Sequence, residues 1–311
     1  MAQDISVDSW TERARSLESQ SKITTFNILA VAEAMDTVFG LKGTEAGLRT
    51  IRTRKGQWKS WDPNIFGVDE ATEGGYIKRL KELHRPIILL SEESERVEIN
   101  LDVEGELLYC VSDPFDGSWL FNRQLSHWWY SSLACYKKDF TPLSAAISDI
   151  HQRLIAFADD EGAFLIKVGK DQLTDKRELD ESYRQSLAGD PITELSNACV
   201  QSYGLKPKKF LKPLLEKYGD LIYSCKMFYP NGGPYGFVNV ATGHVDVYLA
   251  VQQPFVDVFS SLQIAFKADL VVSDFYGRPF KLETEDCRTS YDLVVSRNQK
   301  LHEEVLKKIA K

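Results

Sequence analysis

The sequence predicts an α/β protein, because short apolar runs typical of strands alternate with helical patterns in both halves of the chain. The chain has 311 residues, which is enough for one large domain or two ordinary ones. Hydrophobic residues make up 43% of it and charged residues 27%, a composition that builds a sizeable core without disulfides or structural metals.

The first half begins with a helix and continues with strands. Over residues 22–40, apolar side chains recur at spacings of three and four, which places them on one helical face. The pattern then changes to short apolar runs ended by polar clusters, which is typical of strands. We expect strands at 86–91, 107–112 and 126–137 and a hairpin at 153–168 that turns at 159–162.

The second half follows a charged stretch, 169–190, which has few core residues and is expected on the surface near a domain boundary. We therefore expect two domains, 1–180 and a smaller one at 181–311. The second half is expected to contain helices at 197–204, 208–219 and 261–270, a strand at 243–252, a strand and turn at 270–280, and a surface helix at 298–311.

The acidic balance argues against two classes of partner. The chain has 38 basic and 45 acidic residues, a net charge of −7, whereas nucleic acid polymers and anionic membranes attract cationic surfaces. The N-terminus lacks a secretory signal and no apolar stretch is long enough to span a membrane, so we expect a cytoplasmic protein. The five cysteines are widely spaced with no CxxC pair, as expected of free thiols in a reducing compartment.

Acidic side chains gather where two expected strands end. Glu92 and Glu93 follow the strand at 86–91, and Asp113 and Asp116 follow the next. Such pairs crowd negative charge at one sheet edge unless cations neutralise it. Oxygen ligands with no nearby Cys or His favour Mg²⁺, Mn²⁺ or Ca²⁺ over zinc. The sequence has no GxGxxG, GxxxxGK[ST] or HExxH pattern, and its glycine-bearing turn at 231–236 fits no nucleotide fingerprint.

The hexapeptide Asp113-Pro114-Phe115-Asp116-Gly117-Ser118 is suited to aim two aspartates at one point. Pro114 restricts the backbone, and Gly117 permits a conformation that a Cβ would hinder. Ser118 offers a hydroxyl and, if a helix follows, free N–H groups for a phosphate oxygen. Because the same residues are common in simple turns, the turn alternative stays open for the hexapeptide alone.

The hexapeptide and the Glu92-Glu93 pair resemble the core of the inositol monophosphatase family, which belongs to the lithium-sensitive, magnesium-dependent phosphatases that include fructose-1,6-bisphosphatases. The likeness covers about residues 22–300, is weakest over 169–230, and includes segments in the family's order at 67–73, 240–248, 255–258 and 293–298. The resemblance implies an α+β sandwich with a layered αβαβα arrangement of the sugar-phosphatase type. In it the N-terminal domain binds metal, and the smaller C-terminal domain contributes the last metal ligand.

The resemblance also implies a set of metal ligands. Glu92 would bind one ion and help to activate water, and Asp113 would bridge two ions. The Phe115 carbonyl would bind the first ion, and Asp116 and Asp257 would hold the second. Two or three Mg²⁺ ions per site are implied, with Mn²⁺ as the alternative ion.

The same likeness assigns the phosphate and the attacking water. Gly117 and Ser118 would bind phosphate, the Ser118 hydroxyl would orient the water, and Glu93 would be a supporting carboxylate. In the family an upstream aspartate partners that hydroxyl. The matching position here is Gly75, so we expect Asp69 to substitute as a catalytic residue.

Some positions depart from the family. Val256 replaces a Trp, and Phe259 replaces a small residue behind the last ligand. Ala250 stands where inositol monophosphatases have a Glu that contacts sugar hydroxyls, and losing it argues against strict inositol monophosphatase activity. Because aromatic residues are usually buried, we expect the segment 119–121 to be core rather than a wall of the site.

Together these features predict a phosphoric monoester hydrolase that cleaves a small sugar-type or inositol phosphate with metal-activated water. Fructose-1,6-bisphosphate and 3′-phosphonucleotides are alternative substrates. A catalytically weak homologue that binds metal and phosphate for regulation is the alternative outside the enzymes. The resemblance further implies lithium sensitivity and, because relatives commonly dimerise, a homodimer as one possible assembly.

Overall fold

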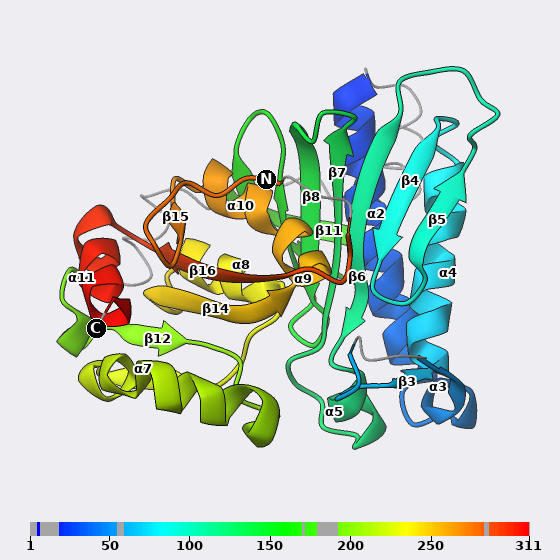
Figure 1. Cartoon of the computed structure of the whole chain (residues 1–311). Helices are drawn as coiled ribbons and strands as arrows, with labels where there is room; N and C mark the ends of the chain where they lie inside the picture. The colour runs from blue at the N-terminus through cyan, green and yellow to red at the C-terminus, as the bar shows by residue number, and fades with distance from the viewer. Residues whose placement is uncertain are drawn as a thin grey trace.

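The protein is built of five layers in which helices and sheets alternate (Figure 1). The computed structural model describes residues 5–6, 19–54, 59–169, 172–178, 192–282 and 286–310. Helices α2 (Ser19–Leu41) and α4 (Gly67–Lys81) cover one face of a nine-stranded sheet. Helices α8 (Tyr235–Ala241), α9 (Phe255–Phe259) and α10 (Leu262–Lys267) lie between that sheet and a five-stranded one. The outer face of the second sheet packs on α7 (Lys212–Ser224) and α11 (Gln299–Ile309). The expected αβαβα arrangement is confirmed.

The large sheet is buried where helices cover it on both sides. Its strands are, in spatial order, β1 (Ile5–Ser6), β11 (Gln172–Glu178), β10 (Ala163–Val168), β9 (Leu154–Ala158), β8 (Pro142–Asp149), β7 (Tyr130–Lys137), β6 (Leu108–Asp116), β4 (Ile87–Ser91) and β5 (Glu95–Ile99). All neighbours pair antiparallel except β4 and β6, which are parallel. The central strands β4, β6 and β7 are buried along nearly their whole length because both of their faces are covered.

The smaller sheet comes from the second half of the chain. Its order is β13 (Met227–Tyr229), β12 (Cys199–Gln201), β14 (Val247–Pro254), β16 (Ser290–Ser296) and β15 (Val271–Asp274). The remaining elements are the pair β2 (Thr50–Thr53) and β3 (Asn64–Phe66) and the short helices α3 (Glu45–Leu48), α5 (Ser118–Asn122), η1 (Leu195–Asn197) and η2 (Pro207–Leu211).

Most expected elements are present, and one expectation needs correction. The segment 197–204 is not a helix: residues 199–201 form β12, because pairing with β13 and β14 on both sides overrides the local pattern. Within the charged stretch 169–190, for which no strand is expected from the sequence, residues 172–178 form β11 against β10. The expected boundary between residues 180 and 181 lies outside the described residues.

Two further observations concern the whole fold. Among the helices of the described ranges, none has the length and apolar character needed to cross a membrane. All five cysteines are free thiols, and Cys225 is the partly exposed one.

Candidate active site

The predicted acidic pairs meet at one edge of the large sheet. Strands β4 and β6 run parallel with Ser91 opposite Ser112, so the residues after both strands emerge side by side. The backbone N–H of Glu92 donates to the Ser112 carbonyl at 3.2 Å. Carboxylate oxygens of Glu92, Asp113 and, from α9, Asp257 lie within 4.8 Å of one another. The structure therefore brings these three predicted ligands together.

A β-bulge turns the hexapeptide out of β6. Between Asp113 and Asp116 this strand gains one residue relative to its partner β7, which redirects the side chains that follow. Gly117 then has a φ of 122°, and a Cβ there would lie 2.7 Å from the Trp128 carbonyl oxygen. This position requires glycine. The turn lets α5 begin at Ser118, with its hydroxyl on the cavity side.

Helix α9 brings Asp257 to the cluster from the other half of the chain. Strand β14 ends at Pro254, and Asp257 lies in the first turn of the helix that follows. The hydroxyls of Ser260 and Ser261 donate to the Asp257 backbone carbonyl at 3.4 and 2.9 Å. Ser132 of β7 donates to Ser260 at 2.8 Å, which ties α9 to the large sheet.

Asp116 lines the same cavity but is outside the three-carboxylate cluster. Its carboxylate lies against Gly233, where a Cβ would overlap with it. Gly233 has a φ of 76° and is held by two hydrogen bonds: Tyr248 donates to its carbonyl at 3.2 Å, and its N–H donates to Gln253 at 3.3 Å. The turn at 231–236, which matches no nucleotide fingerprint, thus makes room for a predicted ligand.

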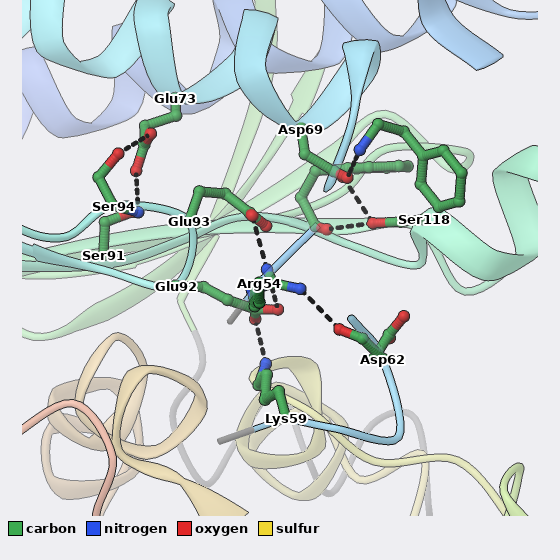
Figure 2. A network of polar contacts seen from close by, with 12 residues as sticks. Arg54, Lys59, Asp62, Asp69, Glu73, Ser91, Glu92, Glu93, Ser94 and Ser118 are labelled. Carbon is green, nitrogen blue, oxygen red and sulfur yellow. Dashed lines mark hydrogen bonds and ion pairs between the residues drawn. The ribbon is translucent and has the colours of Figure 1, made fainter. Parts of the chain in front are cut away.

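Asp69 is the carboxylate that meets the Ser118 hydroxyl (Figure 2). Ser118 Oγ donates to Asp69 Oδ1 at 2.6 Å, and the Phe66 N–H donates to Oδ2 at 2.7 Å. Burial raises the pKa of Asp69 to about 7, although both hydrogen bonds act to lower it. Gly75 lies farther along α4 than Asp69. The missing carboxylate at Gly75 therefore does not deprive Ser118 of a partner, because Asp69 accepts its hydroxyl.

An arginine that sequence reasoning missed joins the Glu92-Glu93 pair (Figure 2). Arg54 Nη2 lies 3.3 Å from Glu92 Oε1 and 2.6 Å from Glu93 Oε2. Glu73 of α4 accepts hydrogen bonds from both the N–H and the hydroxyl of Ser94, which fixes the turn after β4. Burial and the neighbouring carboxylates raise the pKa of Glu93 well above its usual range, which suits a supporting rather than a metal-binding group.

Lys59 brings an ammonium group to Glu92, one member of the carboxylate cluster (Figure 2). Its Nζ lies 2.5 Å from Glu92 Oε2, and its side chain is 8% exposed. Burial alone would lower the pKa of Lys59, but the charges of Glu92, Asp257 and Asp113 raise it. Lys59 therefore stays protonated and acts as a cation for these carboxylates.

The other carboxylates repel one another in a buried setting. Burial, and then the charges of neighbouring carboxylates, raise the pKa of Asp113 and of Asp116 well above the usual range. Burial raises the pKa of Asp257 to about 7 even with the Lys59 ammonium nearby. For Glu92 burial acts in the same direction, but the charges of Lys59 and Arg54 together outweigh it and the pKa falls to about 2. Three of the four carboxylates thus ionise fully at neutral pH only if a further cation arrives.

The donor set fits a divalent cation. Within the described residues, Asp113 Oδ1 and Asp257 Oδ1 are buried without a hydrogen-bond partner, a costly arrangement for carboxylates. A cation held between them would satisfy both atoms. Because the cluster consists of carboxylates alone, it suits Mg²⁺ or Mn²⁺.

The floor of a cavity of about 720 Å³ is formed by Glu92, Asp113, Asp116 and Asp257. Phe115, Gly117 and Ser118 also line this cavity. Trp119 lines its wall and is 45% exposed, whereas Phe121 packs on other aromatic rings in the core. The expectation of a core segment at 119–121 is therefore correct for Phe121 and wrong for Trp119, because one side of α5 faces the cavity and the other faces the core.

The positions that depart from the family pattern near the last predicted ligand lie behind the site and do not line its cavity. Ala250 is fully buried in the core between the sheets. Phe259 packs against Phe280 and Tyr291, also in that core, and Val256 is fully buried beside it. The bulky Phe259 therefore coexists with a last ligand that reaches the cluster.

The basic residues of the site carry only a weak sequence signal. Arg54 and Lys59 belong to the run RTRKGQWK at 52–59, which precedes β3 and α4. A basic run of this kind more often forms a solvated surface. Only its position beside the acidic cluster in the structure identifies it as part of the site.

No protein-family model and no curated protein matches the sequence. Solved structures do match the fold. The extragenic suppressor protein suhB of Bartonella henselae has a TM-score of 0.71 at 14% identity, over 93% of this chain and 99% of its own. An IMPase of Thermotoga maritima has a TM-score of 0.66 at 15% identity, over 92% and 95% of the two chains.

A staphylococcal IMPase-II with inositol monophosphate bound has a TM-score of 0.65 at 19% identity, over 92% of each chain. The same protein with 2′AMP bound has a TM-score of 0.61 at 20% identity, over 89% of this chain and 90% of its own. At these identities the similarity establishes one thing: the chain has the inositol monophosphatase fold, which confirms the fold that the motifs imply.

Proposed function

We propose that this chain, which has the fold of the inositol monophosphatases, is a Mg²⁺-dependent phosphoric monoester hydrolase. The observation that carries the proposal is the cluster of Glu92, Asp113 and Asp257, with two orphaned buried oxygens, beside the Ser118–Asp69 pair. A carboxylate cluster next to a hydroxyl held by a carboxylate supplies both parts that hydrolysis by water needs, a cation site and a proton acceptor.

Two groups of oxygen ligands would hold the ions. Glu92, Asp113 and the Phe115 carbonyl would bind one, and Asp113, Asp116 and Asp257 would bind a second. Bound Mg²⁺ would neutralise phosphate oxygens and lower the pKa of a water molecule. Two or three ions are expected, with Mn²⁺ as a substitute.

The protein's own contribution is to place the water and take its proton. Ser118 Oγ donates to Asp69, so the lone pairs of that oxygen are available to accept a hydrogen bond from water. A pKa of about 7 suits Asp69 to accept a proton near neutral pH. The water oxygen forms a bond to phosphorus as the ester oxygen leaves in line and takes up a proton. Gly117 and Ser118 line the cavity where the phosphate would lie.

Lys59 and Mg²⁺ would share Glu92. The ammonium offsets this carboxylate at 2.5 Å, so an ion that binds Glu92 has to displace Lys59 or bind beside it. We therefore expect Lys59 to reduce the affinity for the first ion.

The substrate is proposed as a small phosphate monoester of a sugar-type or inositol alcohol, as in the inositol monophosphate complex of IMPase-II. Nucleotides are the second candidate, because the same staphylococcal protein also binds 2′AMP. The buried Ala250 gives no carboxylate to sugar hydroxyls, which weighs against strict inositol specificity. A non-catalytic regulatory homologue is less favoured, because Asp69 supplies the proton acceptor that Gly75 lacks.

Phosphate release from sugar, inositol and nucleotide phosphates, with and without Mg²⁺, tests the proposal. We expect turnover that requires Mg²⁺ and is inhibited by Li⁺. Asp113→Asn is expected to lower turnover by more than about 100-fold, since even outer-shell changes at metal sites cost about 10–100-fold. Asp220→Asn, at an exposed position of α7, is the matched control and should leave it unchanged. No release from any substrate at saturating Mg²⁺ would refute the proposal.

A further inference from the structure

The two cations that hold Glu92 come from one connection, between β2 and β3. Arg54 follows β2, and Lys59 is the first residue of a turn at 59–62 that leads to β3. Arg54 Nη2 lies 3.3 Å and Lys59 Nζ lies 2.5 Å from the carboxylate oxygens of Glu92. Because Glu92 is a proposed ligand of the first ion, the position of this turn affects how readily a divalent cation reaches that ligand.

Asp62 contacts both cations through its backbone (Figure 2). Its N–H donates to the Lys59 carbonyl at 2.8 Å, which closes the turn, and its own carbonyl accepts a hydrogen bond from Arg54 Nη1 at 2.8 Å. Its carboxylate binds the other half of the chain, since Oδ2 lies 2.6 Å from Lys206 Nζ. The side chains of this ion pair are only 20% and 24% exposed, so water screens it less than a pair on the open surface. Asp62 thus links the hold on Glu92 to the second half of the chain.

Lys206 directly precedes η2, and this short helix packs on the same turn through an aromatic ring. Phe210 makes a T-shaped contact with Trp61 at a centroid distance of 5.8 Å. Lys209 Nζ lies 4.4 Å from the centroid of the Trp61 ring, a cation–π contact. Together with the ion pair, these contacts fix the turn at 59–62 against η2.

We propose that Lys206 is a positioning residue for the site of the first ion. Through its ion pair with Asp62 it keeps Lys59 on Glu92 and so lowers the affinity of the site for a divalent cation. The inference rests on the proposed metal-dependent function, and it adds control of the first ion by the half of the chain that supplies none of that ion's proposed ligands. When the ion pair is broken, the turn is released, Lys59 spends less time on Glu92, and the incoming cation meets less competition.

Metal binding measured without substrate tests this control directly. Isothermal titration of Mn²⁺ into the metal-free protein gives the affinity of the site whether or not a substrate is turned over. Lys206→Met should tighten Mn²⁺ binding by about two- to fivefold, which is the strength of a partly exposed ion pair. Asp62→Asn keeps the backbone contacts and removes the charge that Lys206 pairs with, so it should tighten Mn²⁺ binding as well. The two substitutions change the net charge in opposite directions, so an effect of charge at a distance would instead loosen binding in Asp62→Asn.

Combined and conservative variants show whether the effect passes through Lys59. In a Lys59→Gln background, Lys206→Met should cause no further change in Mn²⁺ affinity, because the group that it releases is absent. Lys206→Arg keeps a cation opposite Asp62 and should bind Mn²⁺ as the unmodified protein does. Lys208→Met is the matched control: it removes the same charge from an exposed position of the same short helix and leaves the ion pair in place, so the Mn²⁺ affinity should not change.

The outcomes separate this inference from the phosphatase function. Looser Mn²⁺ binding in Asp62→Asn, or an effect of Lys206→Met that persists in the Lys59→Gln background, would overturn the positioning role and leave Mg²⁺-dependent phosphate release intact. The expected shifts in Mn²⁺ affinity without phosphate release from any substrate would keep the positioning role and refute only the phosphatase. If neither the unmodified protein nor any variant binds Mn²⁺, both proposals are refuted.

Discussion

Replacing Asp69 by Asn removes the acceptor of the Ser118 hydroxyl while keeping the size of the side chain. The amide oxygen of Asn can still accept the Phe66 N–H, which Asp69 accepts at 2.7 Å. The amide NH₂ then faces Ser118, where the carboxylate accepts a hydrogen bond at 2.6 Å. A donor replaces an acceptor at this position, and no group remains to take the proton of the water.

Loss of a general base lowers kcat by about 10²–10⁴-fold, which corresponds to about 3–5 kcal/mol in the barrier. KM should change much less. Stability at pH 8 should not fall by more than about 1 kcal/mol, because the hydrogen bond from the Phe66 N–H is retained and because a buried carboxylate with a raised pKa is removed. Steady-state phosphate release at pH 8 and thermal unfolding measure the two effects separately. Glu70→Gln, the exposed neighbour in the same turn, is the control and should affect neither.

A double variant tests whether Asp69 and Ser118 act as one unit. Ser118→Ala alone should lower kcat, and adding it to Asp69→Asn should cost little more, because groups that act together are strongly non-additive. If Asp69→Asn lowers kcat by less than about fivefold, or if the two effects multiply, the pair does not take the proton as proposed.

Three other predictions concern charge and space in the site. Asp257 has a pKa of about 7 in the folded protein against 3.8, so its contribution to stability falls as pH rises from about 4 to 7. Asp257→Asn should thus stabilise the metal-free protein at pH 8 by about 1–4 kcal/mol, an advantage that shrinks toward pH 4 and that urea unfolding in chelator measures. Lys59→Gln should lower the Mg²⁺ concentration for half-saturation by about threefold or more, because a competing charge is removed; an unchanged or higher requirement in a Mg²⁺ titration would show that Lys59 does not compete. Gly233→Ala should destabilise the protein by about 1–3 kcal/mol and reduce activity, because the Cβ meets Asp116 at a positive φ. Gly40→Ala, at an open position of α2, should instead raise stability by up to about 1 kcal/mol, and a similar loss in both would exclude the steric explanation.

The α/β class and the acidic floor of the site were predictable from local sequence, whereas the layered arrangement was implied by the family resemblance. Glu92 follows one strand and Asp113 lies in the next, so the parallel register of the two strands brings them to one edge, and a β-bulge then redirects Asp116. Asp257 depended on resemblance, because no spacing relates it to residues more than 100 positions away. The structure brings it there through β14 and α9.

The remaining parts of the site depend on contacts between distant segments, which local patterns do not encode. Lys59 and Arg54 belong to a basic run that reads as a solvated surface. The need for glycine at position 233 is visible only in the structure, where its turn lies against Asp116. The strand at 199–201 is too short for a periodic pattern, and its two neighbours in the sheet determine its conformation.

The direction of the strands also places the carboxylates of the site at one end of the large sheet and two exposed turns at the other. Strand β6 runs toward the carboxylates, whereas β5 and β7 run away from them, so the turns at 100–107 and 138–141 lie at the opposite end of the sheet (Figure 1). Both turns are largely exposed. They are therefore the places where a fluorophore, an affinity tag or an inserted domain can be attached at the greatest remove from the catalytic groups.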